Sequence, residues 1–294
     1  MLKAGIVCND EGGSQIVSHW VLNSRNYKFL YSLSGPAVKV FKENLFVQDI
    51  LSLEDLVEQC DLLICGTSWQ SDSERMAIKL FKKRGKKTIA ILDHWANYRE
   101  RFSFSNYVVY PDEIWVVDRY AFDIAKNIFQ DIPIKKIANS YFASISNELS
   151  LMQDIEVCKE RILYVCEPIK EHAFLQEGCN IAWGYTEEDA LNYFLANVSK
   201  MPITFNEITI RPHPSEPRNK YDWAKNMKGL NINIGGKKSL LQEIMSSNYI
   251  IGCESMAMVI GLLANKAVYC SIPPYGRDCI LPHKQIVPIK DFLN

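Results

Sequence analysis

The 294-residue sequence lacks the signature motifs of several large enzyme classes. It contains no Gly-x-Ser-x-Gly nucleophile elbow, no His-Glu-x-x-His zinc motif and no Gly-x-Gly-x-x-Gly dinucleotide fingerprint. Residues 235–239 (GGKKS) resemble the end of a phosphate-binding P-loop, but Asn231 stands where the first glycine of that loop is required. These absences argue against a serine hydrolase, a zinc protease and a P-loop ATPase.

The sequence also lacks the Asp-x-Asp motif that holds the metal ion in many enzymes that use nucleotide sugars. The nearest match, Asp72-Ser73-Glu74, lies where a helix is expected to start, and we interpret its acids as capping residues. We therefore expect no essential metal and no other cofactor.

Cysteine spacing and hydropathy bear on the cellular compartment. None of the nine cysteines forms a Cys-x-x-Cys pair, and Cys65, Cys166, Cys253 and Cys270 lie in apolar, strand-like runs. This pattern indicates a reducing compartment and argues against a disulfide framework or a zinc site. No signal-peptide pattern opens the sequence, and no apolar run approaches the roughly 20 residues that span a bilayer. We expect a cytoplasmic protein, and peripheral contact with the inner face of the membrane stays open.

The overall charge limits the classes of partner. The net charge is −1, so no global field attracts the chain to nucleic acid, and we expect no nucleic-acid partner. The hydrophobic content of 48% and the charged content of 23% are those of a folded chain with ordinary cores. The oligomeric state is not determined by these features.

Strand and helix signals alternate along the chain, which predicts an α/β fold with parallel sheets. We expect two Rossmann-like α/β/α domains that face each other across a cleft, residues 1–150 and residues 151–294. The pattern loses its rhythm between Asn139 and Lys159, where we place the domain junction. The expected strands are 3–8, 29–32, 62–65, 88–92, 114–117, 161–166, 207–210, 230–234, 249–252 and 267–271.

The most informative segment is 208–216, an apolar strand that ends in Arg211-Pro212-His213-Pro214. The two prolines restrict the backbone around His213, so the direction of the imidazole is fixed locally. In open α/β sheets ligands bind at the carboxyl ends of strands. With Arg211 at the strand end and Lys220 nearby, we predict that His213 helps to bind a phosphate. The alternative is a rigid loop whose histidine bonds to the backbone.

A second strand end, in segment 249–258, offers Glu254, Ser255 and Met256 at the start of a helix. A helix N-terminus carries partial positive charge and free N–H groups, which suit a phosphate. Alternatively, Ser255 only caps its own helix. Glu254 needs a donor, and either a ribose diol or a basic side chain such as Arg211 or a lysine would provide one.

Two strand ends in the first half supply carboxylates. Asp10 and Glu11 precede Gly12 and Gly13, which allow the close approach of a ligand, although the same letters make a good turn. Asp93 follows the buried strand 88–92 and is a candidate general base. The alternative role for Asp93 is a structural bond to local backbone N–H groups.

These residues resemble motifs of the two-domain GT-B glycosyltransferases, and more narrowly of bacterial sialyltransferases, polysialyltransferases and Kdo transferases, which use CMP-activated acidic sugars. His213-Pro214 matches their His-Pro motif, and Ser255 matches their serine near the CMP phosphate. Asp10-Glu11-Gly12 has the letters of their acid-acid-Gly motif, which supplies the catalytic base. Asp93 is the alternative match by its position after a strand.

The resemblance implies an inverting, metal-independent glycosyl transfer. The first domain would supply the base, from Glu11, Asp10 or Asp93, and the acceptor side. The second domain would bind a nucleotide-sugar donor, expected to be CMP-linked, with His213 stabilising the leaving phosphate. The expected donor-binding residues are Gly12, Gly13, Arg211, Pro214, Lys220, Glu254, Ser255 and Met256. The acceptor would be a glycan or glycolipid of the bacterial surface.

Three other functions fit the same motifs. One is a glycerophosphotransferase with a CDP-linked donor, and another is a UDP-sugar 2-epimerase. The third is a non-catalytic subunit that binds a nucleotide sugar in a polysaccharide assembly complex. A panel of nucleotides tested for thermal stabilisation separates the first two from a CMP-dependent transferase.

Overall fold

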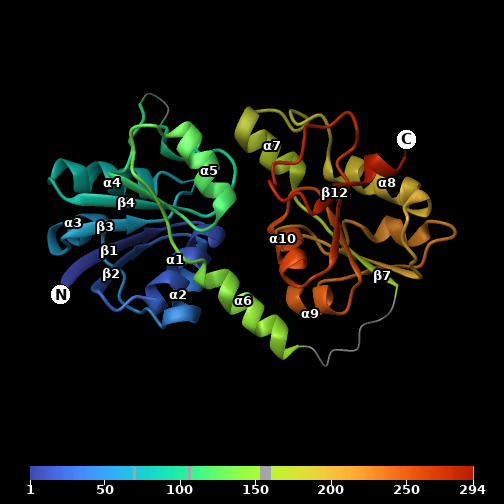
Figure 1. Cartoon of the computed structure of the whole chain (residues 1–294), viewed down its shortest axis with the longest axis horizontal. Helices are drawn as coiled ribbons and strands as arrows, with labels where there is room; N and C mark the ends of the chain where they lie inside the picture. The colour runs from blue at the N-terminus through green and yellow to red at the C-terminus, as the bar shows by residue number, and fades with distance from the viewer. Residues whose placement is uncertain (69–70, 105–106, 153–159, 294) are drawn as a thin grey trace. The chain divides into compact units, whose positions relative to one another are not determined.

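The computed structural model describes residues 1–68, 71–104, 107–152 and 160–293. The chain divides into two compact α/β units, unit 1 (Met1–Ser144) and unit 2 (Ile145–Asn294) (Figure 1). The boundary falls inside helix α6 (Ser140–Leu151), in the region where the sequence pattern loses its rhythm.

Unit 1 is built on one parallel sheet of six strands in the order β2-β1-β3-β4-β5-β6. The strands are β1 (Leu2–Cys8), β2 (Tyr27–Leu33), β3 (Leu62–Cys65), β4 (Lys87–Leu92), β5 (Glu113–Val116) and β6 (Ile134–Lys136). The helices are α1 (Glu11–Asn23), α2 (Pro36–Leu45), α3 (Leu53–Gln59), α4 (Ser73–Lys83), α5 (Arg119–Ile128) and the start of α6.

The core of unit 1 lies on both faces of this sheet. Alternate residues of β1, such as Ile6, pack in one cluster with Val17 of α1 and Phe41 of α2. Gly5 faces the other side, where a Cβ would lie 3.0 Å from Leu56 of α3 and 3.1 Å from Phe81 of α4. The central strands are therefore covered on both faces, which explains why β3 is a continuous apolar run.

Unit 2 repeats the architecture with a parallel sheet in the order β12-β11-β10-β7-β8-β9. The strands are β7 (Arg161–Val165), β8 (Glu207–Arg211), β9 (Ile232–Ile234), β10 (Tyr249–Gly252), β11 (Ala267–Cys270) and β12 (Ile286–Pro288). The helices are α7 (Ile169–Glu177), α8 (Glu187–Asn197), α9 (Leu240–Met245) and α10 (Met256–Leu263). Tyr164 of β7 packs with Phe194 of α8, and a Cβ at Gly252 would lie 2.8 Å from Val165 and 3.1 Å from Met258 of α10.

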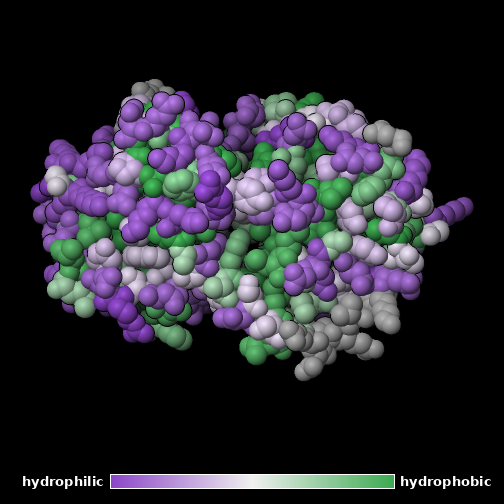
Figure 2. Space-filling model, viewed as in Figure 1, coloured by the Kyte–Doolittle hydropathy of each residue, from purple (hydrophilic) through white to green (hydrophobic). Residues whose placement is uncertain are grey.

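The predicted α/β fold class with parallel sheets is confirmed. The sequence pattern did not predict β6, α6, α7 or β12. Within the described residues no helix is both long enough and apolar enough to cross a membrane. Hydrophilic residues cover much of the face of each unit that Figure 2 displays, as expected when the apolar strands lie inside.

Candidate functional site

Each sheet has a point where the chain reverses its direction of strand addition. In unit 1 the strand β1 lies between β2 and β3, and in unit 2 the strand β7 lies between β8 and β10. Ligands of open parallel sheets bind outside the carboxyl ends of the strands at such switch points. The candidate residues are therefore those that follow β1, β3 and β4 in unit 1, and β7, β8 and β10 in unit 2.

At the edge of unit 1, Asp10 is the N-cap of α1. Its Oδ1 accepts a hydrogen bond of 2.8 Å from the backbone N–H of Gly13. Burial, followed by the negative charge of Asp93, raises the pKa of Asp10 to about 6. A carboxylate that ionises close to neutral pH is suited to accept a proton from a substrate.

Asp93 lies against the same loop. It forms an ion pair of 2.6 Å with Arg101, and both side chains are almost fully buried. Arg101 also donates to the carbonyl oxygen of Thr67 over 2.6 Å. A Cβ at Gly12 would lie 2.9 Å from Oδ2 of Asp93, so the carboxylate packs against this glycine. The two alternative sources of a base, the 10–13 loop and Asp93, thus form one cluster.

Glu11 differs from the members of this cluster in its exposure to solvent. It is the first residue of α1 and its side chain is exposed, whereas Asp10 and Asp93 are partly buried. Asp10 is therefore the better placed of the two acids in the Asp10-Glu11-Gly12 motif.

Glu74 is a further acid at this edge that the sequence analysis did not identify as a site residue. It is 2% exposed, and its Oε1 accepts the backbone N–H of Asn9 over 2.8 Å. Its Oε2 has no hydrogen-bond partner, and burial together with the charge of Asp10 raises the pKa of Glu74 to about 7. The expected helix start is confirmed, because Asp72 occupies the N-cap position of α4 and Glu74 its first turn, but the side chain of Asp72 makes no capping hydrogen bond and bonds to Arg75 instead, over 2.5 Å.

In unit 2, Glu254 follows β10 and is 5% exposed. Its Oε1 accepts bonds of 2.6 and 3.1 Å from Nη2 and Nε of Arg277, and its Oε2 accepts the N–H of Ile280 over 3.2 Å. The partner is a basic side chain, but it is neither Arg211 nor a lysine. The arginine that completes this pair lies 23 residues further along the chain.

Ser255 and Met256 begin α10. The hydroxyl oxygen of Ser255 accepts the N–H of Ala257 over 3.2 Å, so Ser255 caps its own helix, and Met256 is the first helical residue. Behind this turn, Oε1 of Glu167 accepts the N–H groups of Cys253 and Glu254 over 3.2 and 2.8 Å. Loss of contact with water, followed by the charge of Glu254, raises the pKa of Glu167 to about 8.

Arg211 is the last residue of β8, and its side chain forms an ion pair within unit 2. Its Nη1 contacts Oε2 of Glu243 in α9 over 2.6 Å and the carbonyl oxygen of Lys238 over 3.0 Å. Its guanidinium therefore fixes the end of β8 to α9.

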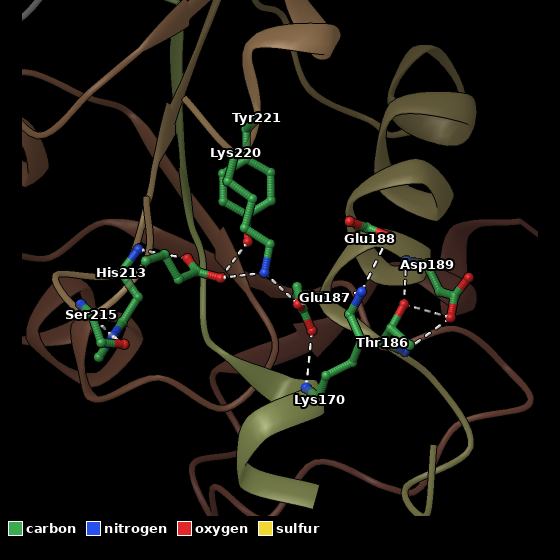
Figure 3. A network of polar contacts seen from close by, with 10 residues as sticks. Lys170, Thr186, Glu187, Glu188, Asp189, His213, Ser215, Lys220 and Tyr221 are labelled. Atoms are coloured by element: carbon green, nitrogen blue, oxygen red, sulfur yellow. Dashed lines mark hydrogen bonds and ion pairs between the residues drawn. The ribbon is translucent and has the colours of Figure 1, made fainter. Parts of the chain in front are cut away.

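The loop that carries His213 is held by a polar network (Figure 3). Oε2 of Glu216 accepts the backbone N–H of His213 over 2.9 Å, and Oε1 of Glu216 accepts bonds from Lys220 and Tyr221 over 2.9 and 2.8 Å. Lys220 also contacts Glu187, which caps the start of α7 by accepting the N–H of Lys170 over 3.0 Å. Lys220 thus lies between two carboxylates that are each 4% exposed.

The tautomer of His213 follows from one contact. The backbone N–H of Ser215 donates to Nδ1 of His213 over 3.3 Å, and the Ser215 hydroxyl lies 2.8 Å from the same nitrogen. Because Nδ1 accepts, the ring proton of the neutral imidazole is on Nε2. His213 can therefore donate a hydrogen bond through Nε2, whereas the following Pro214 is exposed and contributes the restricted backbone.

Three further residues at this edge, His172, Trp183 and Arg277, were not predicted from the sequence. His172 in α7 has its pKa lowered by burial and then by the positive charge of His213. The ring of His172 lies 6.5 Å from that of Trp183, and the guanidinium of Arg277 lies 3.3 Å from the Trp183 ring centre. A prediction of α7 would have placed His172 at the carboxyl edge of the sheet, but residues 169–177 have weak helical periodicity.

The two edges differ in chemical character. The edge of unit 1 carries three partly or fully buried acids and one arginine, whereas the edge of unit 2 combines the carboxylates Glu167 and Glu254 with two imidazoles, Arg277 and the N-terminus of α10. Among the residues that the structure describes, no group of three His, Cys, Asp or Glu side chains is arranged to hold a metal ion.

The architecture is that of the GT-B type, with two α/β units each built on a parallel six-stranded sheet. No protein-family model matches the sequence, and no curated protein sequence matches it significantly. Three solved structures show the same fold. UDP-GlcNAc 2-epimerase from Methanocaldococcus jannaschii has a TM-score of 0.55 at 10% identity, covering 92% of this chain and 83% of that one.

The same enzyme in complex with UDP-GlcNAc and UDP has a TM-score of 0.57 at 10% identity, over 92% and 83% of the two chains. S. aureus MnaA in a co-structure with UDP has a TM-score of 0.58 at 10% identity, over 92% of this chain and 79% of that one. At 10% sequence identity, the similarity to these structures shows the fold alone.

Proposed function

We propose that the protein is an inverting, metal-independent glycosyltransferase that uses a nucleotide-sugar donor. The observation that carries the proposal is the tautomer of His213, whose Nδ1 accepts the N–H of Ser215 and whose Nε2 is therefore a donor. A hydrogen-bond donor at the carboxyl edge of the sheet, where α10 also begins, suits the phosphate that leaves with the nucleotide. The match of His213-Pro214 and Ser255 to the CMP-sugar enzymes favours a CMP-linked acidic sugar.

In the proposed reaction Asp10 acts as the general base. Its carboxylate removes the proton from an acceptor hydroxyl while the hydroxyl oxygen attacks the anomeric carbon of the donor. The bond between that carbon and the phosphate oxygen breaks, and the configuration of the carbon inverts. Asp93, paired with Arg101, keeps negative charge beside Asp10 and so favours the uptake of the proton.

Unit 2 would stabilise the leaving nucleotide phosphate. His213 donates through Nε2, and the N-terminus of α10 contributes its partial positive charge. Ser255 holds the first turn of α10 in place rather than serving only the ligand. Transfer requires that Asp10 and His213 act on the same donor–acceptor complex. A glycan or glycolipid of the bacterial surface, reached from the cytoplasmic side of the membrane, is the acceptor in this proposal.

A second candidate is a UDP-sugar 2-epimerase. Its specific support is the fold shared with structures that contain UDP or UDP-GlcNAc, together with the acids Asp10, Glu74 and Asp93 at one edge. An epimerase inverts a sugar carbon without an acceptor and incorporates solvent hydrogen at that carbon. A transferase instead releases the nucleotide only when an acceptor is present.

The first test compares CMP, CDP and UDP, each titrated against the purified protein in thermal denaturation. A ligand at 100 times its Kd stabilises the native state by about 2.7 kcal/mol, which is readily measured. Stabilisation by CMP alone supports the CMP-linked donor, whereas stabilisation by UDP alone supports the epimerase. No shift with any of the three nucleotides would refute both candidates.

The second test is the replacement of His213. We expect His213→Ala to lower kcat by about 100-fold or more, because a donor to the developing charge is lost. Ser215→Ala is the matched control, since it keeps the backbone N–H that fixes the tautomer and should retain most of the activity. Equal turnover by His213→Ala and wild type would eliminate the leaving-group role.

A further inference from the structure

Two cysteines in unit 2 bond to the same carbonyl oxygen. Cys270, the last residue of β11, donates from Sγ to the carbonyl oxygen of Cys253 over 3.3 Å. Cys279, in the segment that follows β11, donates to the same oxygen over 3.3 Å. Both sulfur atoms therefore lie within hydrogen-bonding distance of the same oxygen, and the ionised Cys279 sulfur can accept the proton of Cys270.

The shared carbonyl lies at the candidate donor-binding edge. Cys253 occupies the turn between β10 and α10, directly before Glu254 and Ser255. The segment that carries Cys279 is fastened to this turn on both sides, because Glu254 accepts bonds from Arg277 and from the N–H of Ile280. Cys279 therefore lies between two residues, Arg277 and Ile280, that both bond to Glu254.

The described cysteines differ in their access to solvent. Cys279 is partly exposed, whereas Cys8, Cys60, Cys65, Cys166, Cys253 and Cys270 are buried, and Cys179 is exposed in a different segment. Hydrogen bonds from Cys270 and from the backbone of Leu281 lower the pKa of the Cys279 thiol. Cys279 is thus the thiol that an oxidant would reach first within this pair.

We propose that Cys270 and Cys279 form a reversible disulfide that acts as a redox modification site behind the donor-binding turn. With hydrogen peroxide as the oxidant, the Cys279 thiolate attacks one oxygen and becomes a sulfenic acid, while the other oxygen leaves as hydroxide and is protonated to water. The Cys270 thiol then attacks Sγ of Cys279, the S–S bond forms, and a second water leaves. Two thiols and one peroxide thus give one disulfide and two waters.

Oxidation removes both S–H donors, so the carbonyl oxygen of Cys253 loses two hydrogen bonds at once. The turn and the Arg277–Glu254 pair then have to rearrange, because a buried carbonyl that loses its partners is unfavourable. On the proposed function, on which this consequence rests, the oxidised protein binds the nucleotide more weakly than the reduced protein.

The experiment treats the reduced full-length protein with hydrogen peroxide and maps linked peptides by mass spectrometry. We expect a peptide pair joined through Cys270 and Cys279, lighter by two hydrogen atoms and restored by dithiothreitol. Cys279→Ser should abolish the pair while keeping the fold, because the serine hydroxyl can still donate to Cys253. Cys179→Ser is the control and should leave the pair unchanged.

The proposal would be overturned if the linked peptides did not form under conditions that oxidise Cys179. It would also be overturned if they still formed in Cys279→Ser. The regulatory consequence is read from nucleotide thermal shifts before and after oxidation, in wild type and in Cys279→Ser. A shift that shrinks at least several-fold in wild type alone supports it, and an equal shift in both redox states refutes it. If no nucleotide shifts the melting temperature of the reduced protein, the proposed function is contradicted. The disulfide is then still tested, because mass spectrometry detects the linked peptides independently of nucleotide binding.

Discussion

At the scale of single residues, the edge of unit 1 concentrates acids that ionise at unusually high pH. Asp10 has a pKa of about 6 and Glu74 a pKa of about 7, both raised mainly by burial. Neither residue has a lysine or arginine as its direct partner in the described part of the chain, since Arg101 pairs with Asp93. Both groups therefore ionise within a pH range in which the folded protein can be studied. The pH dependence of activity reports on Asp10, and that of stability reports on Glu74.

The first prediction concerns the pH dependence of activity. The base must be ionised to accept a proton, so kcat/KM should rise with pH through about 6, the pKa of Asp10. Asp10→Asn should lower kcat by about 100-fold or more, with nucleotide binding retained in thermal-shift titrations. Glu11→Gln, which changes the exposed neighbour, should keep both the activity and the pH profile. Full activity of Asp10→Asn would exclude Asp10 as the base.

The second prediction concerns stability. The pKa of Glu74 is raised from 4.5 to about 7, so the folded state binds this proton more tightly than the unfolded state. The free energy of unfolding should therefore fall as pH rises through this window, by about 3 kcal/mol for this group in total. Urea denaturation at pH 5 and pH 8 measures the loss.

The variant Glu74→Gln cannot ionise and should lose less stability than wild type between these two pH values. Glu58→Gln, at an exposed ion pair with Arg84, is the matched control and should behave as wild type. An identical pH dependence in wild type and Glu74→Gln would show that Glu74 titrates normally.

At the scale of elements, the loop after β8 depends on a lysine between two carboxylates. Lys220 bonds Glu187 at the start of α8 and Glu216, which in turn holds the backbone N–H of His213 (Figure 3). The two carboxylates are almost fully buried, so their pairing with Lys220 differs from an ordinary surface ion pair. The direction of the imidazole thus depends on a residue seven positions away.

The third prediction follows from this network. Lys220→Met should destabilise the protein by about 3 kcal/mol, because it leaves two buried carboxylates without their cation. It should also lower kcat, since Glu216, which holds the backbone N–H of His213, loses one of its donors. Lys225→Met is the matched control, because Lys225 pairs with Asp222 at the surface and its loss should cost less than about 0.5 kcal/mol. Similar melting temperatures for the two variants would contradict the prediction.

At the scale of the whole molecule, the chain consists of two units with separate cores. The core of unit 1 is centred on β1 and β3, and that of unit 2 on β7 and β8. Each unit has the size of an ordinary domain and its own six-stranded sheet. The nucleotide site of the proposal lies in unit 2.

The fourth prediction is that calorimetry resolves two unfolding transitions and that a bound nucleotide raises only one of them. A ligand stabilises the unit that binds it, so the shifted transition should be that of unit 2. Gly12→Ala would place a methyl group 2.9 Å from Asp93 and should lower the transition of unit 1. Gly252→Ala should lower the transition of unit 2, because a Cβ there would lie 2.8 Å from Val165. Equal shifts of both transitions with nucleotide would contradict this assignment.

Local patterns in the sequence were sufficient for the class of fold. Apolar runs such as Leu62–Cys65 are strands because both faces of a parallel strand are buried, and caps such as Ser52 and Thr186 mark helix starts. Short or weakly periodic elements were missed, because β6 and β12 have three residues each and α7 lacks a clear apolar face. The positions of Asp10, Asp93, His213 and Ser255 at strand ends followed from the same local patterns.

The sequence by itself therefore determined the alternation of strands and helices and the polar residues that follow the strands. Only the tertiary structure decided the partners: Arg277 for Glu254, Glu243 for Arg211, and Asp93 beside the Asp10 loop. Periodicity and capping depend on neighbours within one or two turns, whereas the two arginine pairs join residues 23 and 32 positions apart through the packing of separate elements, and Asp93 is further still from the Asp10 loop. Burial follows from the same packing, so the raised pKa values of Asp10 and Glu74 could not be read from the order of the residues.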